Sequence, residues 1–327
     1  MKKITLGSLP VVGISLLAAV GFGLSACWQE NEPPLRVGLV VWPPYEIAYL
    51  AKDLGYFDGI GIQLIDYGSP AEFVIAYQAG SLDAVGTVLD YALELQLADP
   101  GQKIVLMIDH SVGGDAIIAR APATSLMDLK GKRVGYEASA LGGYMLSRAL
   151  EINNMSPDDL ILVPTDIQNQ ETEFRAQTID GVVTYEPTVT ALKNDGHSVV
   201  FDSSQIPFEI IDVLLTREDL SKDKKQKLHM FMQAWFRAFD YFRENPLDAA
   251  RRVTKRQGTS TEDFLAAFDG VELIDLQTNL QFLSGAVPDL LAPLAAHRDR
   301  MMEIGILTVS PAIDAMLDAT FIESVKE

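Results

Sequence analysis

Carboxylates and aromatic rings are concentrated in the segments that follow the β-rich runs of this 327-residue chain. In an open α/β sheet such segments surround the ligand, because they lie beyond the carboxyl ends of the strands. Carboxylates accept hydrogen bonds from N–H and ammonium groups, and aromatic rings stack on flat or cationic groups. The segments include Asp109 and Glu137 but no Lys or Arg. The predicted ligand-binding residues are Trp42, Tyr45, Tyr67, Asp90, Ser111, Gly114, Asp115, Ser139, Tyr185, Glu186 and Asp212.

These residue types favour a solute that donates hydrogen bonds. We predict a ligand with N–H or ammonium donors and a flat or aliphatic body, such as an amine or an amino-pyrimidine. Nitrate, taurine or a sulfonate is the alternative, because Ser139 to Gly143 begins a helix with glycines, and a helix N-terminus binds anions through its N–H groups. Structural roles are also open: Asp115 and Asp212 as anchors of the hinge backbone, and Glu186 as a helix cap.

Cys27 is the only cysteine, and it stands directly behind a secretion-signal pattern. Lys2 and Lys3 give the positive start, residues 4–24 form an apolar run, and small residues precede Cys27. The pattern resembles a bacterial lipobox, in which the thiol is acylated and anchors the protein to a membrane. We therefore predict a signal peptide over 1–26 and a lipidated tether over 27–34. A plain signal peptide and an uncleaved anchor helix are the alternatives, since the run approaches the length of a spanning helix.

The net charge of the chain indicates which kinds of partner it does not bind. The formal net charge is −19, and cleavage of the signal would remove two lysines and make it more negative. Such a surface argues against nucleic acid and against lying flat on anionic lipid. The four histidines show no metal-ligand spacing with one another or with the cysteine. No metal, no cofactor and no intrachain disulfide are expected, and we predict a monomer.

The order of elements predicts an α/β fold. Short β-rich runs alternate with helical stretches from residue 35 to about residue 216, and the rest is almost wholly helical. A β-α-β order indicates parallel-rich sheets flanked by helices. The roughly 300 residues after the signal exceed one comfortable core, so two lobes are expected. No internal repeat is recognised. The helices predicted in the last third span 224–243, 246–257, 260–268, 289–304 and 310–325.

A set of motifs recurs in a family-like order. They are the aromatic opening 42–45 with the motif 48–57, the Gly-x-x-Asp step 80–84, the crossover 111–119, the Asp-Leu-Lys-Gly-Lys run 128–135, and Tyr185-Glu186-Pro187. No single motif is specific, but the ordered set, over residues 35–217, resembles nitrate/sulfonate/taurine-type substrate-binding proteins of ABC transporters.

The resemblance implies a type II periplasmic-binding fold that closes over a solute about a two-strand hinge. Lobe one would comprise 35–114 and 210–327, and lobe two 115–209. An ABC permease and its ATPase would be the partners of a binding protein that is not an enzyme. It would sit on the periplasmic side of the cell envelope, held by lipid on Cys27. The alternatives are a ligand-sensing lipoprotein for a signalling partner and an enzyme of the pyrimidine-synthase-related branch, whose cysteine-rich motif this sequence lacks.

Overall fold

The computed structural model describes residues 33–325. The predicted signal peptide, the lipidation site Cys27 and most of the tether lie outside the described residues. Within 33–325 no helix is both long and apolar enough to cross a lipid bilayer.

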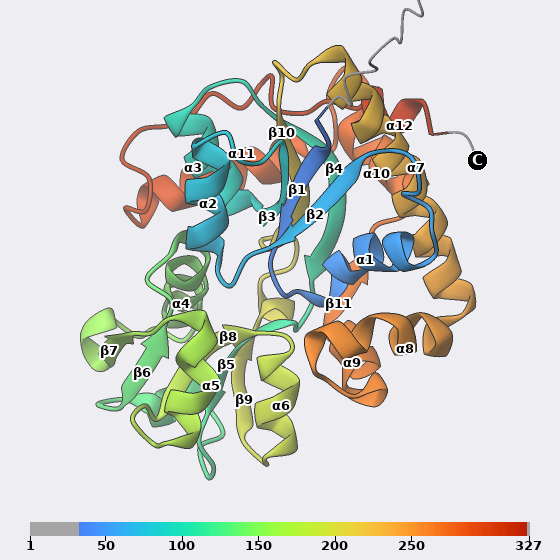
Figure 1. Cartoon of the computed structure of the whole chain (residues 1–327). Helices are drawn as coiled ribbons and strands as arrows, with labels where there is room; N and C mark the ends of the chain where they lie inside the picture. Colours follow the sequence, from blue (N-terminus) through green and yellow to red (C-terminus); the bar gives the residue numbers. More distant parts are fainter. Residues whose placement is uncertain (1–32, 326–327) are drawn as a thin grey trace, which may run out of the picture. The chain divides into compact units, whose positions relative to one another are not determined.

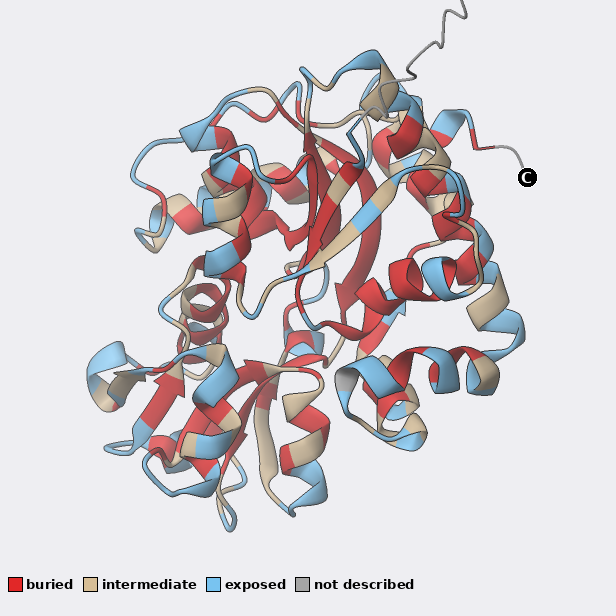
Figure 2. Cartoon of the chain, viewed as in Figure 1, coloured by how far each residue is buried: buried red, intermediate tan, exposed pale blue. Residues whose placement is uncertain are grey.

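The first sheet has the strand order β11-β4-β10-β3-β1-β2 (Figure 1). Its strands are β1 (Leu35–Leu39), β2 (Ile62–Asp66), β3 (Ala84–Val88), β4 (Gln102–Ser111), β10 (Ile211–Arg217) and β11 (Val271–Leu273). The helices between its strands are α1 (Glu46–Asp53), α2 (Pro70–Gln78) and α3 (Leu89–Ala98). Of the central strands, β3 is buried at every residue and β10 at every residue but its last, Arg217 (Figure 2). This burial on both faces explains why they read as continuous apolar runs.

The second sheet has the strand order β7-β6-β8-β5-β9. Its strands are β5 (Asp115–Ala119), β6 (Arg133–Tyr136), β7 (Ile161–Pro164), β8 (Gly181–Tyr185) and β9 (Ser198–Asp202). The helices that accompany it are α4 (Ala140–Ile152), α5 (Ile167–Arg175) and α6 (Thr188–Asn194). The predicted α/β class with helix-flanked sheets is confirmed.

Both sheets are mixed rather than parallel throughout. The β-α-β units pair in parallel, as β1 does with β2 and β3, and as β6 does with β7 and β8. The strands that carry the chain between the sheets are antiparallel to their neighbours: β4 to β10, and β5 to β8 and β9. A parallel pair needs a long crossover connection. Only Val112, Gly113 and Gly114 separate β4 from β5, so the chain passes directly from one sheet to the other.

The C-terminal third is mostly helical, apart from β11 and the segment that precedes its last helix. Its helices are α7 (Lys222–Glu244), α8 (Pro246–Gln257), α9 (Thr261–Ala267), α10 (Leu276–Leu283), α11 (Leu291–Glu303) and α12 (Thr320–Glu323). The prediction of a helix over 310–325 was wrong. Ile104 of β4 donates to the carbonyl of Met316 and accepts from the amide of Asp318. This segment therefore covers part of the edge of β4, which a continuous helix could not do.

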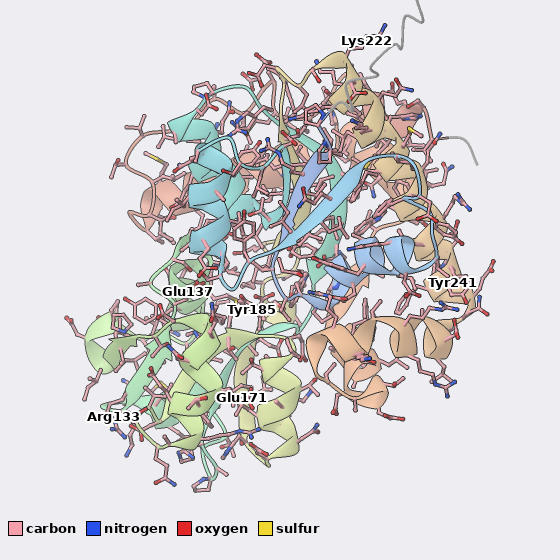
Figure 3. The ribbon with its side chains drawn as sticks, viewed as in Figure 1. Arg133, Glu137, Glu171, Tyr185, Lys222 and Tyr241 are labelled. Atoms are coloured by element: carbon pink, nitrogen blue, oxygen red, sulfur yellow. The ribbon has the colours of Figure 1, made fainter. Side chains whose placement is uncertain are left out.

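An ion pair with the same geometry occurs at the amino ends of both sheets. In the first, Arg36 of β1 donates through Nε and Nη2 to Asp83, which directly precedes β3, at 3.0 and 2.8 Å. In the second, Arg133 of β6 does the same to Asp180, which precedes β8, at 3.1 Å for both bonds (Figure 3). The Arg-Val-Gly triplet is common to both halves. The two halves thus share a repeated unit that the sequence analysis did not recognise.

The two copies of the pair differ in burial. Asp83 is 5% exposed and also accepts from Lys224, whereas Asp180 is 30% exposed. Burial alone would raise the pKa of Asp83, but the hydrogen bonds from Arg36 and Lys224 outweigh it, and the pKa is lowered. Asp83 is thus an ionised group that ties β1 and β3 to the start of α7.

We expect Asp83→Ala to lower the free energy of unfolding by about 3 kcal/mol, because it leaves two partly buried cations without their carboxylate. Asp180→Ala is the matched control, and its more exposed pair should lose about 1 kcal/mol or less. Urea unfolding of both variants measures the difference. Equal losses would contradict this account of the first sheet.

Candidate ligand-binding site

A small cavity lies between the two sheets, at the carboxyl ends of β1, β3 and β8. Its volume, taken as the space open to the centre of a water-sized sphere, is about 40 Å³. On the same measure a single water molecule needs about 10–15 Å³. The first sheet and its helices contribute Val40, Trp42, Tyr45, Pro70, Phe73, Gly86, Thr87, Val88, Tyr91 and Asp212. The second contributes Asp115, Leu141 and Tyr185. Both halves of the protein therefore supply the walls.

Two adjacent carboxyl groups lie where the chain crosses between the sheets. Asp212 on β10 and Asp109 on β4 are paired in register. The Tyr45 hydroxyl donates to Asp212, and Trp42 Nε1 donates to Asp109 Oδ2 at 3.2 Å. Asp115, the first residue of β5, supplies a third carboxyl group from the other side of the cavity. All three side chains are almost fully buried.

Burial changes the acidity of these groups. It raises the pKa of Asp115 to about 7 and that of Asp212 to about 8. It also raises the pKa of Asp109 well above its ordinary value, and the neighbouring Asp212 adds to that effect. None of the described lining residues is Lys or Arg. A buried carboxylate needs a cation or hydrogen-bond donors to stay ionised, so the cavity suits a ligand that supplies them.

Aromatic rings form much of the wall. Trp42 meets Tyr185 edge to face, with ring centroids 6.0 Å apart, and Phe73 meets Tyr91 in the same way at 5.9 Å. The Thr87 hydroxyl is buried at the cavity without a hydrogen-bond partner among the described residues, and the Tyr91 hydroxyl is buried there as well. A ligand could therefore stack on the rings and exchange hydrogen bonds with hydroxyls as well as carboxyls.

The structure brings five of the predicted ligand-binding residues to this cavity, namely Trp42, Tyr45, Asp115, Tyr185 and Asp212. It does not bring the others there. Ser111 and Gly114 instead hold the chain where it crosses: Ser111 Oγ lies 2.7 Å from Ser203 Oγ, and the Gly114 amide donates to the carbonyl of Gly270 at 2.8 Å.

Two further predicted residues make contacts at helix starts. Ser139 caps α4, because its Oγ accepts a hydrogen bond from the amide of Gly142. The same hydroxyl donates to Glu137 at 2.9 Å. Both oxygens of Glu186 accept hydrogen bonds at 2.9 Å, from the amide and the hydroxyl of Thr190. Neither residue lines the cavity.

The last two predicted residues, Asp90 and Tyr67, also lie outside the cavity lining. Asp90 is fully buried against α11, with Oδ1 3.1 Å from Nε2 of His297. Tyr67 follows β2, and its amide donates to the carbonyl of Leu39. Ligand contact by Asp90, Tyr67, Ser111, Gly114, Ser139 or Glu186 has no support from this geometry and stays a prediction.

Sequence reasoning missed most of the apolar lining and one polar pair. Thr87 stands three residues before the predicted Asp90 and Tyr91 directly after it. At the β3-α3 junction Asp90 lies against α11, whereas Tyr91 lines the cavity. Phe73 and Pro70 had a weak signal in the cap at Ser69, which marks the start of α2 beside the site. Nothing in the sequence distinguished Gly86 or Val40 from ordinary strand residues.

Comparison with known protein families identifies the family of this chain. A family model described as NMT1/THI5 like matches residues 42–249. The chain belongs to the NMT1/THI5-like family. This NMT1/THI5-like protein is 31% identical over 186 residues to a binding protein of Brucella abortus, and the match covers 55% of this chain. The matched region is only 56% of the length of the Brucella protein. A relative from Brachyspira hyodysenteriae named as an ABC transporter periplasmic binding protein is 23% identical, with 62% and 64% of the two chains covered.

Solved structures confirm the fold of this NMT1/THI5-like protein. The alkanesulfonate-binding protein SsuA from Xanthomonas axonopodis superposes with a TM-score of 0.71 at 15% identity, covering 88% of this chain and 96% of SsuA. The desulfurization enzyme DszB superposes with a TM-score of 0.68 at 18% identity, covering 89% and 99%. The predicted resemblance to nitrate/sulfonate/taurine-type binding proteins is thus confirmed for family and fold. The family rests on the matching family model, and the solved structures, at such identities, show the fold alone.

We expect the buried carboxyls to make the NMT1/THI5-like protein less stable as the pH rises from about 5 to about 9. Between the unfolded pKa near 4 and their raised folded values, these groups hold protons in the folded state that the unfolded chain has released. Each can contribute a slope of at most about 1.4 kcal/mol per pH unit. His110 and His197, whose pKa values burial lowers, act in the opposite direction.

The measurement is urea unfolding across this pH range for the native protein and an Asp115→Asn, Asp212→Asn double variant. The double variant should show the smaller decline, whereas Asp58→Asn, at an exposed position, should leave the native profile unchanged. Identical profiles for the native protein and the double variant would show that these carboxyls are ionised in the folded state.

Proposed function

We propose that this chain is a lipid-anchored solute-binding protein that captures a small organic molecule between two lobes and delivers it to an ABC permease. The observation that carries the proposal is the cavity, which both sheets line and which combines aromatic walls with buried carboxyl groups. Such a convergence of apolar surface and a few fixed polar groups is typical of small-molecule sites. The ABC transporter name of the Brachyspira relative supports the transport role.

The proposed ligand carries N–H or ammonium donors, as an amine or an amino-pyrimidine does. Asp115 and Asp212 would accept its hydrogen bonds, and Trp42 and Tyr185 would contact its flat or aliphatic body. These contacts would replace part of the solvation that the carboxyl groups lose on burial.

A sulfonate or nitrate fits the site less well. The glycine-containing N-terminus of α4 was the feature that favoured an anion. Ser139 there hydrogen-bonds Glu137, so a carboxylate already lies beside the helix start. An anionic ligand there would lie beside the acidic side chains of Glu137 and Asp115, and the described lining offers no cation in compensation.

Capture requires the lobes to separate and close. Trp42, Tyr45 and Asp212 are each less than 5% exposed, so a solute cannot reach them without movement of the walls. We propose that lobe one (35–114 and 210–327) and lobe two (115–209) rotate about the two connections near Gly114 and Asp212. Ligand contacts to both lobes would then favour the closed state.

The remaining parts of the proposal concern location and chemistry. Acylation of Cys27 would hold a monomer on the periplasmic side of a membrane, beside the permease and its ATPase. Catalysis is not proposed. The single cysteine belongs to the lipobox-like sequence, and among the described cavity-lining residues there is no Cys, Ser or His to act as a nucleophile or base.

A thermal-shift panel tests the ligand class. We expect primary amines or amino-pyrimidines at millimolar concentration to raise the melting temperature by a few degrees, because they bind only the folded state. Nitrate, taurine and alkylsulfonates should not. The double variant Asp115→Asn, Asp212→Asn should lose the shift. Stabilisation by the anions alone would refute the proposed ligand class.

Small-angle scattering tests the closure. With the amine or amino-pyrimidine that gives the largest shift, we expect the radius of gyration to fall by roughly 1 Å, because hinge closure brings two lobes together. Trp42→Ala, which removes a lining ring, should weaken the response at the same concentration. An unchanged radius at a saturating concentration would argue for a rigid site.

A further inference from the structure

A histidine on α11 is buried against α3. His297 is 3% exposed, and its Nε2 lies 3.1 Å from Oδ1 of Asp90, which is fully buried. No hydrogen bond from the other described residues reaches the ring nitrogens of His297 or the carboxyl oxygens of Asp90. Each of these two side chains therefore depends on the other as its polar partner, and the contact ties α11 to α3 within lobe one.

An aromatic ring from lobe two stacks on this histidine. Tyr144 on α4 is 1% exposed, and its ring lies over the imidazole of His297, with centroids 4.3 Å apart and planes at 26°. The Tyr144 hydroxyl donates to Glu209 at 2.7 Å, and Arg148 donates to both oxygens of the same carboxylate at 2.6 and 2.9 Å. These bonds fix the ring of Tyr144 from within its own lobe. The imidazole is thus held by lobe one and faces a ring held by lobe two.

The stack is a local contact beside a groove. The groove has a volume of about 350 Å³, on the measure used above for the cavity between the sheets, and is lined by residues of α4, α11 and the connection 207–209. It interrupts the packing between the two helices. Arg300 of α11 also pairs with Glu151 of α4, but Glu151 is 52% exposed, and an exposed ion pair contributes little. The buried stack of Tyr144 on His297 is therefore the stronger of these two links between α4 and α11.

The stack lies behind two walls of the candidate ligand cavity. Asp90 directly precedes Tyr91 on α3, and Tyr91 lines the cavity from lobe one. Leu141 stands three residues before Tyr144 on α4 and lines the cavity from lobe two. α4 lies between the helices of the first sheet and the second sheet (Figure 1). The helices that carry these two walls are therefore the ones that the contacts of His297 join.

We propose that His297 is a positioning residue that holds the two lobes in the arrangement that encloses the ligand. The proposal rests on the proposed function, because it assumes lobes that separate and close. Separation of α4 from α11 would break the stack and expose the rings of Tyr144 and His297 to water, which is unfavourable for apolar surface. A bound solute leaves after this separation, so the contact acts on the rate of dissociation.

Histidine combines two contacts that other side chains make singly. Its ring stacks on Tyr144, and its Nε2 faces the buried carboxyl group of Asp90. Glutamine offers an amide donor to Asp90 but no ring, whereas phenylalanine offers a ring but no donor. The variants His297→Gln and His297→Phe therefore separate the link between the lobes from the local stability of lobe one.

Small-angle scattering of the ligand-free protein tests the link directly. We expect His297→Gln and Tyr144→Leu to raise the radius of gyration above the native value by up to roughly 1 Å, as opening about a hinge does. Tyr144→Phe keeps the ring and should keep the native radius. His297→Phe should also keep it, but with a melting temperature lower by several degrees, because Asp90 loses its polar partner. Far-UV circular dichroism checks that the variants fold.

Dissociation kinetics give the second measurement, because a merely structural role would not change them selectively. Butylamine and 4-aminopyrimidine are the probes, and tryptophan fluorescence follows their release, since Trp42 lines the cavity. We expect His297→Gln and Tyr144→Leu to release a bound probe about twofold to tenfold faster than the native protein, the range that one aromatic pair allows. Tyr144→Phe and His297→Phe should release it at the native rate.

Native radii and native release rates in His297→Gln and Tyr144→Leu would refute the positioning role and leave the proposed function standing. A larger radius in all four variants would also refute it, because the stacked ring would then make no difference. If neither probe binds, the proposed ligand class is refuted, and the radii of the ligand-free variants still decide the role of His297. If the His297 variants do not fold, Tyr144→Leu and Tyr144→Phe decide it.

Discussion

The structure depends on the carboxyl groups of Asp109, Asp115 and Asp212, which are buried between the two sheets and for which the described residues supply no ion pair. Burying a carboxylate is unfavourable unless its hydrogen bonds are replaced. The fold replaces some of them with neutral donors, because Tyr45 donates to Asp212 and Trp42 donates to Asp109. The donors are themselves walls of the cavity, so the same contacts that make the carboxyls tolerable also fix the orientation of the rings. A ligand with N–H donors would supply the hydrogen bonds to these carboxyl groups that the fold does not replace.

The crossing between the sheets determines where these groups lie. Asp109 and Asp115 stand at the two ends of one short connection, and Asp212 returns beside Asp109. A third segment braces the connection, since the carbonyl of Gly270 accepts from the amides of Val112 and Gly114. A side chain at Gly114 would collide with Trp42 at 2.9 Å, so glycine is needed for this close approach. The C-terminal part also reaches the second sheet's helices, where Asn194 of α6 donates to Asp263 of α9.

The repeated unit explains why the amino ends and the carboxyl ends of the strands differ. In each half an arginine near the start of one strand pairs with an aspartate that directly precedes a neighbouring strand of the same sheet. A glycine two residues after that arginine gives room for an apolar side chain. These ion pairs stabilise the amino ends of the strands. The carboxyl ends of neighbouring strands converge on the cavity from both halves. The ion pairs and the cavity therefore lie at opposite ends of the sheets.

The sequence by itself determined most of the elements and five of the residues that line the cavity. Apolar runs, caps and glycine stops fixed most strands and helices, and the strand-end rule selected Trp42, Tyr45, Asp115, Tyr185 and Asp212, because carboxyl ends of neighbouring strands meet at one edge. Only the tertiary structure decided what depends on contacts between distant residues. In the folded protein Asp90 lies against His297, and Glu186 accepts hydrogen bonds from Thr190. The segment predicted as a helix over 310–325 instead pairs with β4 through Met316 and Asp318. Local pattern records which face of an element is apolar, but not which partner a polar side chain finds once the elements pack.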